Sequence, residues 1–462
     1  MQRRAVLLLG LLCLLCRSAA ADDGRPPNVL FIAIDDLRDW VTFCGRDPLG
    51  ITPAIDRLAA RGTACSRAYC AAPVCNPSRT ALMSGIRPWT SGVYENETDW
   101  RSMIPIDLPL TTAFRRGGYR VCGAGKIYHD SFRRPEEWDD YLDSPGNDPQ
   151  PPAGADTGVG SIRFAPVDCR DDELEDWKIT DYGIAELGRR HEQPFFLAIG
   201  LHKPHMPWFV PRKYYDMVPL DAIDLPPHQA GDLDDVPDAG RRMADPDGHH
   251  ARMLATGRWK EAVQGYRAAI AYTDMNVGRL LEALDRSPER DRTIVCLWSD
   301  HGWHLGEKSH WRKFALWEEA TRSPLIWIVP GLTKPGTICD RPVDFMTIYP
   351  TLMDLCGLPT PSHVQGVSMR PLLVDPGAEW PSPAVTTHKQ GNHAIRTAAW
   401  RYIRYANGDE ELYDERQDPN EWVNLAGRPE HAALKARLAT SLPPADRPAE
   451  AGPPPFTPPR PR

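Results

Sequence analysis

The chain has 462 residues and a formal net charge of -8, and 42% of its residues are hydrophobic. A chain of this length can bury a large core, as two domains or as one large domain with an appendage. The negative charge, without a broad basic stretch, argues against a nucleic-acid partner. An anionic substrate must therefore be met by a local cluster of cationic side chains.

The first 21 residues have the layout of an export signal. Two arginines precede an apolar run from Ala5 to Cys16, and small residues follow it up to Ala21. The run is too short to cross a membrane as a mature helix, and no later segment is apolar enough to do so. We expect cleavage after residue 21 and export to a periplasmic, secreted or lysosomal location, without a membrane anchor.

Cysteine usage fits an exported protein. Nine cysteines remain after cleavage, and one of them, Cys75, is discussed below as a chemical group. The even number that is left permits disulfides, although their pairing does not follow from the sequence. The cysteine spacing shows no zinc-binding pattern.

Residues 28 to about 360 alternate short apolar runs with helical patterns. This alternation predicts an α/β fold with a mainly parallel sheet sandwiched by helices. The predicted buried strands cover residues 28–34, 119–123, 194–200, 293–298 and 324–329, and the clearest helices cover 53–60 and 259–284. Two stretches rich in proline, residues 135–170 and 219–250, predict long surface loops.

The pattern changes after residue 360. Alternating, aromatic-rich segments at 394–397, 400–405 and 411–414 precede a helical pattern at 430–441. They predict a small antiparallel C-terminal subdomain of residues 361–442, packed on the larger domain of residues 28–360. Residues 443–462 are rich in proline and are expected to form a disordered tail.

Polar side chains follow four of the predicted strands, at the point where each strand ends. These segments are Asp35-Asp36, Lys126 to His129, His202 to His205, and Asp300-His301. The carboxyl ends of the strands form the edge where ligands bind in open parallel sheets. The sequence therefore predicts that these residues converge on one crevice.

Three carboxylates would meet in that crevice. Asp35, Asp36 and Asp300 would repel one another in a partly dry site, so we expect a divalent cation between them. Oxygen ligands favour Ca2+ or Mg2+, while the neighbouring His301 leaves room for a softer metal.

Residues 72–85 predict a short helix with the thiol of Cys75 at its N-terminus. Pro77 suits the first turn, Ser78 is a candidate cap, and Gly85 is a natural stop. Free amide groups at the helix start, together with Arg79, would hold a tetrahedral oxyanion. Cys75 therefore lies next to the position where this oxyanion would bind.

These motifs resemble those of a known family. Cys75, Pro77, Ser78 and Arg79, continued by Thr80 and Gly85, resemble the signature of type I sulfatases, whose cysteine is oxidised to formylglycine. The segments His202-Lys203-Pro204-His205 and Ser299 to Glu307, continuing to Trp311 and Lys313, look like those of iduronate-2-sulfatase and its bacterial relatives. The similarity covers roughly residues 28 to 360.

The resemblance implies an alkaline phosphatase/sulfatase-like fold, with residues 28–360 as the catalytic domain. It also implies a formylglycine-generating enzyme as the maturation partner of Cys75. One Ca2+ would be bound by the modified Cys75 together with Asp35, Asp36, Asp300 and His301.

The resemblance to type I sulfatases also implies catalytic roles for several residues of this chain. Arg79 and Lys126 would hold the formylglycine hydrate and the sulfate oxygens, while one hydroxyl of the hydrate attacks sulfur. Lys313 and His205 would face the leaving oxygen, with His205 as the proton donor. His129 would take the proton of the second hydroxyl, so that sulfate is expelled and the aldehyde is regenerated.

The implied substrate is a sulfated carbohydrate, for this branch the 2-O-sulfate of a uronic acid in a glycosaminoglycan-type glycan. Because a uronate carries a carboxylate besides its sulfate, a second cationic contact is expected. Lys203 and Arg101 are the candidates, and Trp100 is grouped with them as a substrate-binding residue.

Three alternatives remain open at this point. The enzyme could act on another sulfated polysaccharide or a small sulfate ester, since loop sequences do not reveal the sugar. It could instead hydrolyse a phosphate or phosphonate ester on the same fold. A secreted glycan-binding protein that lost catalysis is the alternative outside enzymes, against which the intact Cys75, Arg79 and Lys126 speak.

Overall fold

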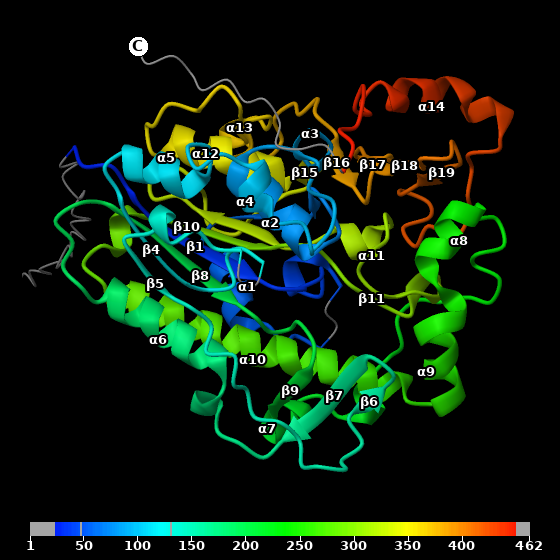
Figure 1. Cartoon of the computed structure of the whole chain (residues 1–462), viewed down its shortest axis with the longest axis horizontal. Coiled ribbons are helices and arrows are strands. Elements are labelled where there is room, and N and C mark those ends of the chain that lie inside the picture. Colours follow the sequence, from blue (N-terminus) through cyan, green and yellow to red (C-terminus); the bar gives the residue numbers. More distant parts are fainter. Residues whose placement is uncertain (1–23, 47–48, 130–131, 450–462) are drawn as a thin grey trace, which may run out of the picture.

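A mixed sheet of eight strands forms the centre of the described chain (Figure 1). The computed structural model describes residues 24–46, 49–129 and 132–449. The neighbouring strands follow the order β14 (Thr337–Cys339), β2 (Thr63–Cys65), β13 (Leu325–Ile328), β10 (Thr293–Ser299), β1 (Asn28–Ile34), β8 (Phe195–Leu201), β4 (Arg120–Gly125) and β5 (Asp140–Leu142). Only β13 runs antiparallel to its neighbours β10 and β2. The mainly parallel α/β sheet is thus confirmed.

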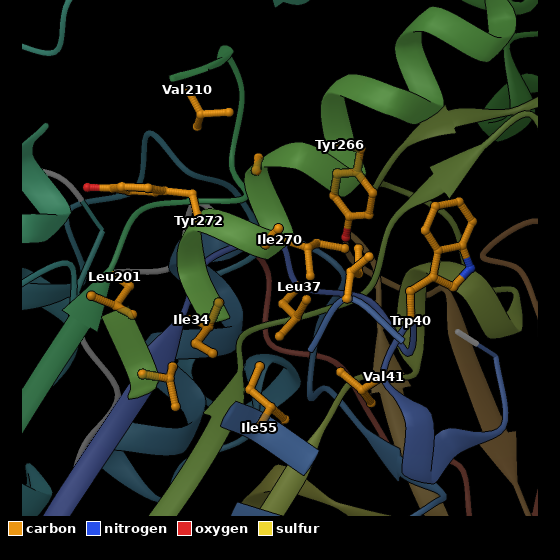
Figure 2. Packing of buried hydrophobic residues seen from close by; sticks show 14 of the residues in the cluster. Ile34, Leu37, Trp40, Val41, Ile55, Leu201, Val210, Tyr266, Ile270 and Tyr272 are labelled. Carbon is orange, nitrogen blue, oxygen red and sulfur yellow. The ribbon is translucent and has the colours of Figure 1, made fainter. Parts of the chain in front are cut away.

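The central strand β1 is buried on both faces. Its side chains at 30, 32 and 34 belong to one apolar cluster, which includes residues of α1 (Pro53–Ala59), α6 (Glu175–Leu187) and α10 (Trp259–Arg286). Figure 2 shows Ile34 and Leu37 beside Ile270 of α10. This packing fixes the end of β1, from which the candidate metal ligands project.

The odd-numbered side chains of β1 point to the opposite layer. Val29, Phe31 and Ala33 belong to a second cluster, which includes residues of α2 (Cys75–Ser84), α5 (Leu110–Arg116) and α12 (Ile348–Leu355). The alternation is the period of two expected for a strand between two helical layers. The expected sandwich of helices around the sheet is therefore present.

Strand register brings the predicted polar residues to one edge. Ile34, the last residue of β1, pairs with Ser299 of β10 and with Leu201 of β8. Gly125 at the end of β4 pairs with Gly200 of β8. The residues that follow these strands therefore start side by side, as the sequence predicted.

Two glycines allow β4 and β8 to come close at that edge. A side chain on Gly200 would place its Cβ 2.3 Å from the Lys126 backbone, and one on Gly125, where φ is +73°, would meet the Gly200 carbonyl at 2.1 Å. Neither position can hold a larger residue without moving the backbone. Their small size therefore helps to place Lys126.

The two segments expected to be loops contain regular structure. Residues 135–170 include β5, β6 (Gly158–Val159) and β7 (Ile162–Val167), and residues 219–250 include α8 (Asp238–Ala244). The prediction was wrong here because the strands are short, and β5 and β7 pair with strands outside the segment. β7 contains a proline and pairs in parallel with β9 (Trp208–Pro211), about forty residues later.

The C-terminal part forms a four-stranded antiparallel sheet, as predicted. Its strands are β16 (Ala384–Thr387), which the sequence did not indicate, β17 (His393–Arg396), β18 (Trp400–Arg404) and β19 (Glu410–Asp414), followed by α14 (Ala432–Ala439). Figure 1 shows this sheet at one end of the molecule, with α8 nearby. The exact domain boundary at residue 361 remains a prediction.

The chain ends are described only in part. The expected export signal at residues 1–21 and residues 450–462 of the expected tail lie outside the described residues. Residues 443–449 contact the larger domain, since the Arg447 amide donates to the Trp89 carbonyl at 2.8 Å. Across the described ranges, all nine cysteines are free thiols, and no helix combines the length and apolar character needed to span a membrane.

Candidate active site

Helix α2 presents Cys75 as its first residue. Val74 precedes the helix in an extended conformation, and Gly85 ends it with a φ of +72°. The expectation that Ser78 caps the helix is wrong: Ser78 lies inside it, and its hydroxyl donates to the Asp300 carbonyl at 2.5 Å. Ser78 therefore ties the helix to the metal-binding edge.

The residue after Cys75 anchors the helix start from the other side. The Asn76 amide donates to Asn96 Oδ1 at 3.0 Å, and Asn76 Nδ2 donates to the Thr98 carbonyl at 2.7 Å. These bonds satisfy a donor of the first turn that has no partner within the helix. Cys75 is thus held rigidly, and it is fully buried.

Charged groups surround the Cys75 sulfur. Lys313 Nζ lies 2.9 Å from Sγ, His301 Nε2 lies 3.3 Å away, and Asp36 Oδ1 lies 3.9 Å away. Burial alone would raise the pKa of Cys75, but Lys313 and further cationic neighbours hold that pKa well below its usual value. The surroundings of residue 75 therefore stabilise a negatively charged group at this position.

Arg79 joins two of the predicted metal ligands. Its Nη2 donates to Asp35 Oδ1 at 3.0 Å, and its Nε donates to Asp300 Oδ2 at 2.9 Å, with all three side chains fully buried. Lys126 Nζ contacts the other oxygen of Asp35 at 2.7 Å. Burial would raise the pKa of Asp35, yet the cations, Lys126 foremost, hold it well below its usual value.

The donor set suits a divalent cation. Ligand atoms of Asp36, Cys75, Asp300 and His301 all lie within 4.8 Å of one another, and Asp35 belongs to an overlapping group with the same spread. Asp36 Oδ2 is buried without a hydrogen-bond partner in the described chain, and a buried carboxylate oxygen of that kind calls for a cation. The residues therefore fit a metal bound mainly by oxygen.

The backbone at Asp36 is strained, and hydrogen bonds with Tyr266 stabilise it. Asp36 has a φ of +61°, which is rare for a residue with a side chain. The Tyr266 hydroxyl donates to the Asp36 carbonyl at 2.7 Å and accepts from the Arg38 amide at 3.0 Å. Strain of this kind is found at functional sites, where the surrounding structure enforces it.

The predicted histidines differ in their surroundings. For His205, 35% of the side chain is accessible, and its Nε2 is 3.7 Å from Asp36 Oδ2. Its Nδ1 donates to the Met206 carbonyl at 2.6 Å, which leaves Nε2 directed at the site. His129 is half-buried with its ring 6.4 Å from that of Phe132, and its catalytic role stays a prediction.

The three predicted substrate-binding residues differ in their surroundings. Lys203 is buried and pairs with Asp148 Oδ2 at 3.1 Å. Trp100 is also buried and stacks on Tyr128, with ring centroids 4.4 Å apart. Only Arg101 lines a cavity next to the centre. The roles of Lys203 and Trp100 in direct substrate contact remain predictions, and both positions have clear packing roles.

A cavity of about 550 Å3 opens beside Lys126. Besides Arg101, its walls include Tyr128 and His202, which lie in segments that the sequence predicted at this edge, and Arg133 and Tyr141, which the sequence analysis had not selected. Arg133 makes two bonds to Asp143, at 2.9 and 2.8 Å, and lies 4.6 Å from the Tyr141 ring. Tyr141 lies in the stretch expected to be a loop and Arg133 lies just before it, and neither position carried a motif.

Fold and site together define a class of protein. A buried, activated residue at a helix start, a carboxylate cluster fit for a divalent cation, and flanking lysines stand at the ligand-binding edge of an α/β sheet. Such a centre stabilises negative charge that builds up around a tetrahedral oxyanion. It belongs to a hydrolase of anionic esters.

Comparison with known proteins narrows this class. The model of the sulfatase family matches residues 27–358, and that of the N-sulphoglucosamine sulphohydrolase C-terminal region matches residues 306–447. The chain therefore belongs to the sulfatase family, and it is a sulfuric ester hydrolase.

Individual relatives agree with this assignment. A sulfatase of Formosa agariphila is 36% identical over 95% of this chain and 92% of its own length. The iduronate 2-sulfatase of Mus musculus is 30% identical over 77% of this chain and 73% of its own. Among solved structures, a phosphonate monoester hydrolase from Silicibacter pomeroyi has a TM-score of 0.76 at 22% identity, over 90% of this chain and 94% of its own. The expected sulfatase-like fold is confirmed.

Proposed function

We propose that this sulfatase hydrolyses the 2-O-sulfate of a uronic acid in a sulfated glycan, through a formylglycine made from Cys75 by a maturation enzyme. The observation that carries the proposal is the position of Cys75, at a helix start and 2.9 Å from Lys313 Nζ. A formylglycine at this position would supply, as its hydrate, a geminal diol whose two hydroxyls serve as the nucleophile and as the group that expels sulfate.

The residues around Cys75 would bind and orient the sulfate group. Lys313 and Lys126 are nearly fully buried, and each ammonium faces the carboxylate cluster. Their charge would stabilise the negative charge that spreads over the sulfuryl oxygens, which is the largest contribution in reactions of this kind. Arg79 would hold Asp35 and Asp300 in the geometry that the metal needs.

His205 would handle the proton of the leaving alcohol. Burial lowers the pKa of His205, which favours the neutral imidazole in the free enzyme. A bound sulfate ester brings negative charge next to Nε2 and favours the protonated form. The imidazolium can then donate from Nε2 to the leaving oxygen, while His129 is proposed as the base for the second hydroxyl.

One Ca2+ is the proposed metal, held by Asp35, Asp36, Asp300, His301 and the modified residue 75. Oxygen-rich ligation supports a hard cation. Such an ion would neutralise charge on the sulfuryl oxygens. His301 Nδ1 donates to the Gly302 carbonyl at 3.0 Å, which leaves Nε2 available as a ligand.

The cavity beside Lys126 supports a uronate as substrate. Arg101 and Arg133 place two guanidinium groups on its walls, and a guanidinium matches the geometry of a carboxylate. Both arginines pair with partly exposed aspartates, Asp99 and Asp143, and a substrate carboxylate could compete for them. Similarity to an iduronate 2-sulfatase supports the same substrate class.

A phosphonate monoester is the second candidate, favoured by the TM-score of 0.76 to a phosphonate monoester hydrolase. The experiment compares kcat/KM for iduronic acid 2-sulfate, glucosamine 6-sulfate and phenyl phenylphosphonate, using protein from a host that makes formylglycine. We expect the uronate sulfate to be preferred at least tenfold, and Arg101→Gln to raise its KM while leaving the glucosamine sulfate unaffected. Preference for the phosphonate, or an equal rate on both sulfated sugars, would overturn the proposed substrate.

A further inference from the structure

A second cavity, of about 590 Å3, shares no lining residue with the first. Its walls include Glu95, Arg242, Phe314, His388 and Lys389. Arg242 belongs to α8, and His388 and Lys389 follow β16. The cavity is thus built between the larger domain and the C-terminal sheet, in the region where Figure 1 shows α8 near that sheet.

This cavity adjoins the reactive centre. Phe314 follows Lys313 in the chain, and its amide donates to the Pro73 carbonyl at 3.2 Å. The Glu95 carbonyl accepts from Asn76 Nδ2 at 3.0 Å. Two of the cavity walls therefore contact the chain on either side of Cys75.

The cavity carries two cations that form no ion pair with any residue in the described part of the chain. Arg242 and Lys389 are exposed, and within the described ranges neither side chain has a hydrogen bond or an ion pair. Glu95 is the carboxylate on the same walls; burial raises the pKa of Glu95, and the nearby charge of Lys389 opposes that shift. An anionic ligand would therefore find two available cations here.

A buried histidine in the wall also has an unused polar atom. His388 is only 2% exposed, and its Nδ1 has no hydrogen-bond partner among the described residues. Burial lowers the pKa of His388 to about 3, so the ring is neutral. A neutral imidazole suits a hydrogen bond with an uncharged hydroxyl group.

Two wall residues hold strained backbone conformations. Phe314 has a φ of +75° and Lys389 has a φ of +57°, in the left-handed region that disfavours residues with side chains. Asn392 enforces the second of these, because its Nδ2 donates to the His388 carbonyl at 2.9 Å and its own carbonyl accepts from the His388 amide at 3.0 Å. Such strain is kept where it positions functional side chains.

We propose that this cavity binds the sugar next to the one that loses its sulfate, and that Arg242 and Lys389 bind a sulfate group on that neighbouring sugar. The inference rests on the proposed function and deepens it. Phe314 would pack on the face of the sugar ring, and Glu95 and His388 would bind its hydroxyls. The substrate would then be at least a disaccharide with anionic groups on both units.

The test uses the double variant Arg242→Gln/Lys389→Gln with a matched control, Arg190→Gln/Lys334→Gln. The control removes the same two charges from exposed positions that line neither cavity. Three substrates are compared: 4-nitrophenyl sulfate, a heparin disaccharide with sulfate on both the uronate and the glucosamine, and the same disaccharide without glucosamine sulfate.

We expect the double variant to raise KM for the doubly sulfated disaccharide at least tenfold and to change the other two substrates less than twofold. The control should resemble the wild type on all three. An unchanged KM for the doubly sulfated disaccharide, in protein that hydrolyses 4-nitrophenyl sulfate normally, would overturn the inference while the proposed function stands.

A binding measurement separates the two proposals. Cys75→Ala protein, which cannot form formylglycine, is titrated calorimetrically with the doubly sulfated disaccharide, with and without the Arg242 and Lys389 substitutions. A Kd at least tenfold weaker after the substitutions supports the cavity assignment, even if the wild type hydrolyses no sulfated uronate and the proposed function fails. Equal Kd values would overturn the assignment.

Discussion

Lys313 Nζ lies 2.9 Å from Cys75 Sγ and 2.8 Å from Asp36 Oδ1. One buried ammonium therefore joins the reactive residue to the carboxylate cluster. Burial opposes its charge, but Asp36 and Cys75 raise the pKa of Lys313 above its usual value. Lys313 thus stays protonated at all working pH values, which suits charge stabilisation and excludes it as a general base.

Lys313→Met is expected to lower kcat for a sulfate ester by about 100-fold to 1000-fold, the range for removal of one preorganised charge donor. Steady-state kinetics, with circular dichroism to confirm folding, test this. Lys308→Met is the contrasting variant, because Lys308 is also buried but pairs with Asp232 at 3.0 Å. It should lower Tm and leave kcat within a few fold. A Lys313 variant with near wild-type kcat would contradict the assigned role.

Removal of divalent cations should abolish activity and lower Tm. A ligand that binds only the folded state stabilises it by RT ln(1 + [L]/Kd), about 2.7 kcal/mol at one hundred times Kd. Differential scanning fluorimetry with EDTA, followed by added Ca2+, measures the effect. Asp36→Asn should remove the Ca2+ response, whereas Asp221→Asn, at an exposed position, should keep it. Full activity in EDTA would show that no metal is needed.

A buried aspartate outside the centre gives a pH-dependent prediction. Asp274 on α10 accepts hydrogen bonds from the Ala54 and Ile55 amides at the start of α1, at 2.9 and 2.8 Å. Burial raises the pKa of Asp274 to about 6, although these two bonds oppose the shift. Between about pH 4 and pH 6 the folded state therefore binds a proton that the unfolded chain has released.

Protonated Asp274 therefore contributes fully to the free energy of unfolding below about pH 4. This contribution is lost as the pH rises through 6, and the free energy of unfolding falls by about 3 kcal/mol. Asp274→Asn cannot titrate, so the stability of the wild type relative to this variant should fall over that interval. Urea unfolding at pH 4.5 and 7.0 measures the difference. Glu282→Gln, exposed on the same helix, should show a constant difference. A constant difference for the Asp274 variant would contradict the assigned pKa.

Arg401 holds the C-terminal sheet to the larger domain. It is fully buried and contacts Glu318 of α11 (Glu318–Thr321), Glu415 and Glu421, and it donates to the Leu316 carbonyl at 2.9 Å. Arg401→Met leaves Glu421 without its cation, while Glu318 and Glu415 keep their contacts with Arg396, so we expect a loss of about 3–5 kcal/mol. Arg404→Met, exposed on the same strand, should cost little. Calorimetry and limited proteolysis measure the outcome, and equal Tm values for the two variants would disprove the role.

The convergence of Asp35, Lys126, His205 and Asp300 could be predicted because parallel strands end at a common edge, whatever their order in the sheet. The buried runs of β1, β8 and β10 were equally readable, because they are continuous and apolar. Sequence motifs then placed Cys75 and Arg79 at the same edge.

Other features of the site could not be predicted from the sequence, because they depend on contacts between segments that are far apart in the chain. Ser78 looked like a helix cap, yet the helix starts earlier and its hydroxyl reaches Asp300. Tyr266 supports the backbone of Asp36 from the middle of a long helix, with no motif to mark it. Arg133 and Tyr141 line the first cavity from a stretch whose short strand pairs with β4 of the main sheet.

The central claim is that Cys75 acts as formylglycine, and mass spectrometry of the tryptic peptide from Ala68 to Arg79 tests it most directly. The protein is made in a host with a formylglycine-generating enzyme and assayed for sulfate release before digestion. The account predicts an aldehyde in place of the Cys75 thiol, in a fraction that rises in proportion to activity among preparations. Fully active protein with an unmodified Cys75 thiol would contradict it.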